Sequence, residues 1–199
     1  MRTIGITGGV GAGKSQVLAL MKEHFDADVI LADEVAHELM EPGGGSFEGI
    51  KARYGKRVLQ PSGQIDRKAL AGIIFRDDEE RLAVNAIVHP LVKEEIKKRI
   101  GNSSKELVVV EAALLLEDHY NEFLDEIWYV YAPEEGRIER LIKSRSYTRQ
   151  KALEIMGSQK SDEEFRQCCS VVIDNSRSLD CTLIQLKRIL TDTGIKERG

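Results

Sequence analysis

The stretch GITGGVGAGKSQ, residues 5–16, places glycine at positions 5, 8, 9, 11 and 13 and follows these glycines with Lys14 and Ser15. Residues 8–15 match the P-loop pattern G-x-x-x-x-G-K-[ST], with a β-branched run before them and a helical pattern after them. Glycines allow main-chain N–H groups to approach phosphate oxygens with dihedral angles that a Cβ atom would forbid. The stretch therefore predicts a triphosphate-binding loop between a first strand and a first helix.

The chemistry of this loop assigns roles to its residues. The helix that starts near Lys14 directs the positive end of its dipole at the phosphates, Lys14 can reach the β- and γ-oxygens, and the Ser15 hydroxyl can ligate Mg²⁺. A plain strand-to-helix turn is the alternative, and it would leave Lys14 and Ser15 unexplained. A dinucleotide-binding turn fails because its pattern ends in glycine, where this chain has lysine or glutamine. The residues expected to bind the nucleoside triphosphate are Gly9, Gly11, Ala12, Gly13, Lys14, Ser15 and Gln16.

Short apolar runs alternate with amphipathic helical patterns along the rest of the chain. This alternation predicts an α/β fold with a parallel sheet that has helices on both faces. With the P-loop, the fold class expected is a three-layer P-loop core, which the motifs described below assign to a kinase. The five expected strands are Thr3–Thr7, Ala27–Ala32, Leu107–Leu114, Glu126–Tyr131 and Ser170–Asp174.

Two helical segments interrupt this alternation. We expect residues 1–33, 105–133 and 170–199 to form the nucleotide-binding core, residues 34–104 a helical acceptor-binding subdomain, and residues 134–169 a helical lid. A small-molecule kinase needs one element to hold the acceptor and another to exclude water. Within the first insertion we expect helices near 66–75 and 78–100, the second kinked or broken at His89-Pro90 because proline removes a main-chain donor.

Composition narrows the function classes. A net charge of −4 argues against a protein that coats nucleic acid. The longest apolar run, residues 107–116, is interrupted by Glu111 and is too short for a bilayer. The three cysteines lack metal or redox spacing, and the N-terminus shows no secretory signal. We expect a cytoplasmic protein with no membrane or nucleic-acid partner, as a monomer or weak oligomer.

Further motifs separate the nucleotide-binding classes. The strings N-K-x-D and D-x-x-G, typical of GTP switches, do not occur in the sequence. The P-loop, VILADEVAHELMEPGG, YGKRVL, GQIDRKAL, NAIVHP, ALLLE and VVIDN follow one another in the order seen in dephospho-coenzyme A kinases, and the chain resembles that family over roughly residues 2 to 190. The resemblance implies transfer of the γ-phosphoryl group of ATP to the ribose 3′-hydroxyl of dephospho-CoA. Another small-molecule kinase, acting on a nucleoside or a nucleoside monophosphate, is the alternative.

On the acceptor side, the resemblance makes Asp33 the residue that orients or deprotonates the attacking hydroxyl. The alternative is that Asp33 caps a helix starting at Glu34. Many family members carry a second Asp where this chain has Leu31. The resemblance also assigns four residues to the dephospho-CoA pocket, with a structural histidine as the alternative for the first: His89, Pro90, Leu114 and Leu115. Asp66 and Arg67 fit the same subdomain, with an ion pair that holds two helices as the alternative to a role in the pocket.

On the donor side, Glu111 is expected to hold Mg²⁺ through water, unless it merely lies near the exposed end of its strand. The family commonly has Pro where this chain has Ala113. The resemblance places Arg140 and Arg145 among the lid arginines that stabilise charge on the transferred group, whereas Arg137 and Lys143 fit a solvated helix face. The run after Arg145 departs from the usual Arg-Asp-Gly.

Asn175 directly follows the last expected strand. It is expected either to contact the adenine of ATP or simply to end the strand.

Overall fold

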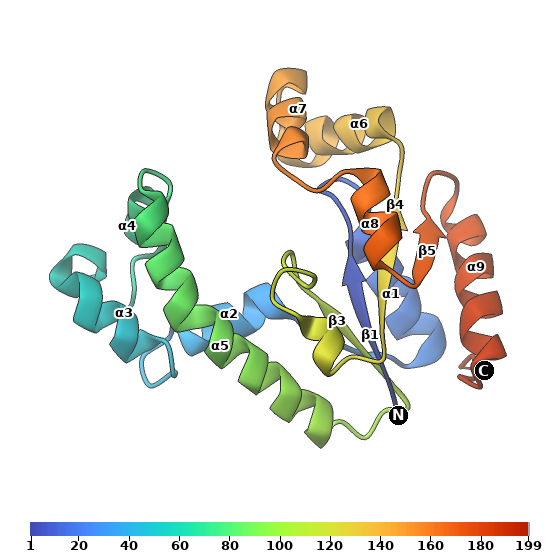
Figure 1. Ribbon diagram of the computed structural model, residues 1–199, viewed down its shortest axis with the longest axis horizontal. Helices are drawn as coiled ribbons and strands as arrows, with labels where there is room; N and C mark the ends of the chain where they lie inside the picture. The colour runs from blue at the N-terminus through green and yellow to red at the C-terminus, as the bar shows by residue number, and fades with distance from the viewer. Residues whose placement is uncertain (199) are drawn as a thin grey trace. The chain divides into compact units, whose positions relative to one another are not determined.

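The computed structural model of the chain describes residues 1–198. The chain forms two compact units, one made of Met1–Val29 with Ser103–Gly199 and the other of Ile30–Asn102 (Figure 1).

The predicted five-stranded parallel sheet is confirmed, in the order β2-β3-β1-β4-β5. The strands are β1 Arg2–Thr7, β2 Asp28–Leu31, β3 Leu107–Glu111, β4 Glu126–Tyr131 and β5 Val171–Asp174. β1 lies between β3 and β4, with Ile6 opposite Glu111 on one side and Trp128 on the other. The strand order therefore reverses beside β1, the point at which open α/β sheets bind their ligands.

Both faces of the sheet are covered. Thr3–Thr7 and residues 107–110 are buried without interruption, as expected for strands packed on two sides. The helices of this unit are α1 Lys14–Phe25, α6 Glu134–Arg145, α7 Arg149–Gly157, α8 Asp162–Cys168 and α9 Leu179–Asp192. In Figure 1, α8 lies in front of the strands and α1 behind them.

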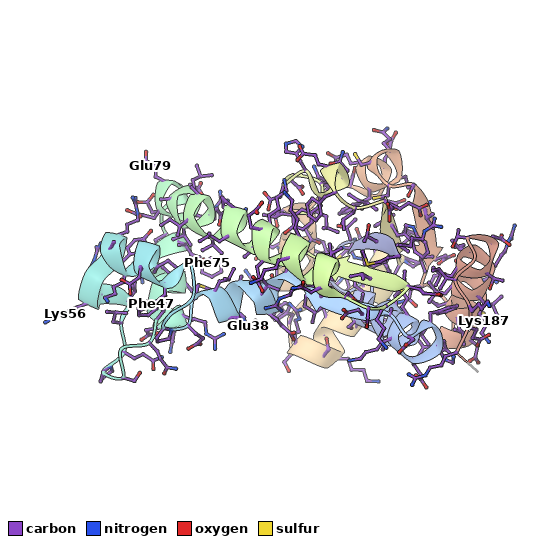
Figure 2. The ribbon with its side chains drawn as sticks, turned by 90° about the horizontal axis from the view of Figure 1, so that it is seen from below. Glu38, Phe47, Lys56, Phe75, Glu79 and Lys187 are labelled. Carbon is purple, nitrogen blue, oxygen red and sulfur yellow. The ribbon has the colours of Figure 1, made fainter. Side chains whose placement is uncertain are left out.

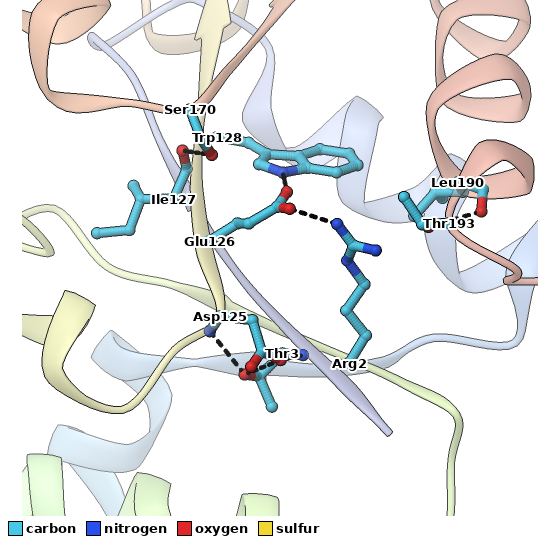
Figure 3. A network of polar contacts seen from close by, with 9 residues as sticks. All are labelled: Arg2, Thr3, Asp125, Glu126, Ile127, Trp128, Ser170, Leu190 and Thr193. Carbon is cyan, nitrogen blue, oxygen red and sulfur yellow. Dashed lines mark hydrogen bonds and ion pairs between the residues drawn. The ribbon is translucent and has the colours of Figure 1, made fainter.

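A polar network joins the first residues of β1 and β4 (Figure 3). The Asp125 carboxylate accepts hydrogen bonds from the Thr3 N–H at 2.7 Å and the Thr3 hydroxyl at 2.9 Å. The Glu126 carboxylate pairs with Arg2 and accepts a hydrogen bond from Trp128 Nε1 at 2.6 Å. Because parallel strands with a fixed start keep their register, this network also aligns the carboxyl ends of β1 and β4.

One expected strand is too long. β3 ends at Glu111, three residues before the predicted Leu114. The chain turns after Glu111, and Ala113 and Leu114 are exposed. Apolar side chains alone did not distinguish the strand from the turn that follows it.

The second unit is helical. Its helices are α2 Ala32–Leu39, α3 Phe47–Tyr54, α4 Arg67–Ile74 and α5 Asp78–Asn102, with a 3-10 turn at Gly55–Val58. α5 contacts α2, α3 and α4 through a stripe of buried residues four apart: Val84, Val88, Val92, Ile96 and Ile100. Glu38 of α2, labelled in Figure 2, pairs with Arg99 of α5.

Two local expectations for this unit, an ion pair of Asp66 between helices and a helix break at Pro90, are wrong. Asp66 forms no ion pair between helices; it caps α4 and accepts hydrogen bonds from the N–H groups of Lys68 and Ala69 at 3.0 Å each. Pro90 does not break the long helix, because α5 runs through it. Pro90 is exposed and lies two residues from Val88 and from Val92, so it faces away from the buried stripe.

Among residues 1–198, no helix combines the length and the apolar character that crossing a bilayer requires.

We predict that Pro90→Ala stabilises the protein. Alanine restores the N–H donor that proline lacks and relieves crowding within the helix, so the gain should be about 1–3 kcal/mol. Thermal unfolding measures it, and a lowered midpoint would mean that the α5 backbone at Pro90 is adapted to proline.

Candidate active site

The P-loop, residues 8–13 between β1 and α1, has the conformation that its glycines permit. Gly8, Gly11 and Gly13 adopt φ angles of 145°, 79° and 90°. A Cβ on Gly8 would lie 2.5 Å from the Val130 carbonyl oxygen. Backbone conformation and close packing therefore both require glycine here.

Side chains from outside the loop bind its carbonyl groups. The Ala12 carbonyl accepts hydrogen bonds at 2.9 Å from Arg140 Nη1 and at 2.9 Å from Asn175 Nδ2. Arg140 Nη1 also donates to the Gly11 carbonyl at 3.3 Å. Arg137 Nε donates to the Val10 carbonyl at 2.9 Å. Three successive carbonyl oxygens, which would repel phosphate, are thus bound by donor side chains.

The N–H groups of the loop behave in the opposite way. Within the described residues, the N–H groups of Gly11, Gly13, Lys14 and Ser15 donate no hydrogen bond to the protein. The last two belong to the first turn of α1, where a helix leaves its N–H groups without internal partners. Since the helix dipole adds positive potential at the same place, this arrangement suits an anion.

Lys14 and Glu111 meet at the carboxyl end of β1 and β3. Lys14 Nζ donates to the Gly8 carbonyl at 2.8 Å and lies 3.5 Å from Glu111 Oε1. Glu111 is the last residue of β3 and is half-buried. Glu111 therefore ends its strand, and its carboxylate lies beside the P-loop lysine.

Asn175 follows β5 directly and is 1% exposed. Its amide donates to Ala12, as described above, and its Oδ1 accepts a hydrogen bond from Thr182 Oγ1 at 2.9 Å. Its main-chain carbonyl accepts from Arg140 Nη2 at 2.7 Å. In this conformation Asn175 connects the P-loop to α9 and offers an adenine ring almost no surface.

Arg137 is the residue that sequence reasoning placed wrongly. It is half-buried against the P-loop rather than on a solvated face, and burial lowers the pKa of its guanidinium. Arg137 and Arg140 are three residues apart on one helix, so they face the same way. That spacing was the signal available in the sequence. Lys143 is exposed, as expected of a solvated helix face.

Other predicted site residues lie apart from the P-loop contacts. Arg145 is exposed at the last position of α6. Leu115 is fully buried and Leu114 is 39% exposed, so only Leu114 of this pair offers side-chain surface to a ligand.

Asp33 and His89 belong to the second unit. Asp33 is exposed in the first turn of α2, two residues after β2. The capping alternative is wrong, because α2 begins at Ala32 after Leu31 and has no side-chain cap. His89 is half-buried in α5. No cluster of three metal-ligating side chains occurs among the residues that the structure describes.

A parallel α/β sheet with a glycine loop before α1, an accessible helix N-terminus and a lysine in the loop defines a P-loop nucleotide-binding protein. The sequence model of the dephospho-CoA kinase family matches residues 2–180. The chain belongs to the dephospho-CoA kinase family, as the resemblance predicted.

Individual relatives agree with this assignment. A dephospho-CoA kinase of Carboxydothermus hydrogenoformans is 38% identical over 190 residues, which cover 94% of this chain and 92% of the relative. A crystal structure of a Thermus thermophilus protein is 31% identical, with a TM-score of 0.82 over 96% of this chain and 97% of that one. A dephospho-CoA kinase of Campylobacter jejuni, 21% identical with a TM-score of 0.71 over 98% and 100% of the two chains, supports the fold.

We predict that Gly13→Ala weakens ATP binding about tenfold or more. The methyl group would be strained at a φ of 90° and would lie 2.2 Å from Asn175 Nδ2, so the loop or the asparagine must move. Calorimetric titration with ATP measures the loss. Gly194→Ala is the matched control, with a φ of 85° in the same unit and no neighbour within 4 Å. Equal ATP affinity in the two variants would contradict the prediction.

Proposed function

We propose that this chain transfers the γ-phosphoryl group of ATP to the ribose 3′-hydroxyl of dephospho-CoA, giving CoA and ADP in the last step of CoA synthesis. The observation that supports this most strongly is the combination of a phosphate-binding P-loop with family membership over residues 2–180. Phosphoryl transfer depends mainly on positioning and on charge neutralisation. The proposed roles follow from what each side chain can supply to those two needs.

The donor phosphates would bind the N–H groups of Gly11, Gly13, Lys14 and Ser15, which make no hydrogen bond within the described protein. Lys14 would exchange the Gly8 carbonyl for the β- and γ-oxygens, because an ammonium group binds a phosphate oxygen more strongly than a neutral carbonyl. Asn175 would act by shaping the loop at Ala12 rather than by contacting adenine.

The residues at the end of the loop fit a Mg²⁺ ion. Ser15 is exposed at the start of α1, and Glu111 supplies a carboxylate beside Lys14. A hydroxyl and a carboxylate suit a hard cation that keeps most of its water and phosphate ligands. Bound there, Mg²⁺ would neutralise charge that develops on the β- and γ-oxygens.

Asp33 would position the acceptor hydroxyl and take up its proton. It is an exposed carboxylate two residues after β2, near the carboxyl end of a strand of the parallel sheet, where ligands of such folds gather. Because Asp33 does not cap α2, its carboxylate is available for a role in the reaction. His89, Pro90 and Leu114 are proposed to contact dephospho-CoA.

Arg140 would place a fixed positive charge behind the phosphates. Its guanidinium donates to three main-chain carbonyls, a geometry that a lysine could not reproduce. Arg145, exposed at the end of α6, would reach the transferred group only through a movement of the lid.

We also propose the division into a nucleotide-binding core, an acceptor-binding subdomain at 34–104 and a lid at 134–169. With a net charge of −4, the partners proposed are small molecules in the cytoplasm rather than nucleic acid or membrane, and the chain acts as a monomer or weak oligomer.

The function is tested by measuring ADP release with dephospho-CoA and with a panel of nucleosides and nucleoside monophosphates. We expect turnover with dephospho-CoA, reduced roughly 100- to 1000-fold in Lys14→Ala because a donor to the transition-state charge is lost. A nucleoside preferred over dephospho-CoA would refute the proposal. Full activity in Lys14→Ala would remove the P-loop lysine from the mechanism.

Asp33→Asn separates acceptor activation from donor binding. The amide keeps the shape of the side chain but cannot accept the hydroxyl proton, so we expect kcat to fall about 100-fold or more while the dissociation constant of ATP changes less than about threefold. Steady-state kinetics and ATP titration give the two values. An unchanged kcat would exclude Asp33 from the reaction.

A further inference from the structure

The main chain of Val10, at the tip of the P-loop, is bound on both sides by side chains distant in sequence. Its N–H donates to Gln159 Oε1 at 2.9 Å, and its carbonyl accepts from Arg137 Nε at 2.9 Å. The two side chains also bind each other, with Arg137 Nη2 3.1 Å from Gln159 Oε1. These three hydrogen bonds form a closed ring, which we call the Val10 clamp.

The side chain of Val10 adds an apolar contact to the same region. It packs against a buried cluster formed by Ile138 and Leu141 of α6 and Ala152 of α7. The tip of the P-loop is therefore attached to the α6–α7 helices both by apolar packing and by hydrogen bonds.

Neighbouring contacts hold Gln159 where the clamp needs it. Lys160 Nζ lies 3.2 Å from Glu117 Oε1, in the segment after β3. Ser161 then caps α8, with a reciprocal hydrogen bond between Glu164 and the Ser161 N–H. The segment that carries Gln159 is thus fixed on one side by an ion pair and on the other by a helix cap.

Gly9 leaves room for the clamp. A Cβ on Gly9 would lie 2.1 Å from Arg137 Nη2 and 2.5 Å from its Cζ. The guanidinium group therefore lies directly on the Gly9 backbone, and any other residue at this position would displace it.

We propose that Arg137 and Gln159 are positioning residues for phosphoryl transfer, which act by holding the P-loop in its phosphate-binding shape through the main-chain N–H and carbonyl of Val10. The Val10 N–H donates to Gln159, a residue outside the loop. The N–H groups of Gly11, Gly13, Lys14 and Ser15 donate to no group of the described protein, so they are available to the ligand. The clamp thus separates the main-chain groups that support the loop from those that bind phosphate. This inference rests on ATP being the ligand of the proposed function.

The mechanism has a distinctive kinetic consequence. Without the clamp the loop samples other conformations, and ATP binds only the fraction that is correctly shaped, which raises the apparent dissociation constant by the inverse of that fraction. Once ATP is bound the loop is correctly shaped again. Loss of the clamp should therefore raise the KM for ATP and leave kcat and the KM for dephospho-CoA nearly unchanged.

The first measurement is amide exchange at Val10, followed by NMR on the full chain without nucleotide. We expect the Val10 amide to exchange slowly in the wild type and about tenfold or more faster in Gln159→Met, which has no strong acceptor. Rapid exchange at Val10 in the wild type would overturn the proposal, and this outcome requires no variant to fold.

Kinetics of four variants give the second measurement. We expect Gln159→Met and Arg137→Met each to raise the KM for ATP about tenfold, with kcat within about twofold of the wild type. Gln159→Glu keeps the acceptor oxygen and should stay closer to the wild type. In the double variant the KM should be no more than about threefold above that of Arg137→Met, because both side chains hold the main chain of the same residue and bind each other. The proposal would be overturned if the fold-increases in the KM for ATP of the two single variants multiplied in the double variant, or if the variants lowered kcat instead.

Arg149→Met is the matched control. Arg149 is an exposed arginine of the same helical segment and pairs with Glu135 rather than with the P-loop, so its loss should leave the KM for ATP unchanged. A wild type that binds ATP but does not phosphorylate dephospho-CoA would refute the proposed function alone. The clamp would still be judged by Val10 exchange and ATP affinity.

Discussion

The polarity of the main chain around residues 8–15 is the constraint on which the site depends. Each peptide carries a donor and an acceptor, so a loop that presents N–H groups to an anion must place its carbonyls elsewhere. Here Arg137, Arg140 and Asn175 bind the carbonyls of Val10, Gly11 and Ala12 from outside. The glycines make the conformation possible, and these side chains select it from the many conformations that glycine allows.

To bind the loop carbonyls, these side chains must come from elements far apart in the chain that lie beside β1. The strand order brings them there, because β1 lies between β3 and β4 and α6 follows β4. At the opposite end, Arg2 and Thr3 are bound by Glu126 and Asp125, which fixes how β1 and β4 start. A shift of one residue in that register would turn every side chain of β4 to the other face and move α6 with it.

The sequence was sufficient for the number and order of the strands along the chain, the P-loop and the family, because each is encoded in local spacing, but it ran β3 on into the turn after Glu111. Prediction from the sequence failed for residues whose surroundings depend on which face of a helix is buried. Pro90 looked like a helix breaker, yet it lies opposite the buried stripe of α5. Arg137 looked solvated, yet its face of α6 packs on Gly11 and Val10. Gln159 carried no signal at all, since its partner lies 149 residues earlier in the chain.

Glycine is favoured in the loop for two different reasons. Gly11 and Gly13 have positive φ angles, so a side chain there is strained wherever its atoms go. Gly9 has no such angle, and the nearest atoms that a Cβ there would meet belong to the Arg137 guanidinium. At position 9 the Arg137 guanidinium therefore favours glycine by crowding, whereas at positions 11 and 13 the φ angle itself favours glycine. It follows that Gly9 and Arg137 form a complementary pair, in which a larger residue at position 9 is tolerated only where the arginine no longer occupies that space.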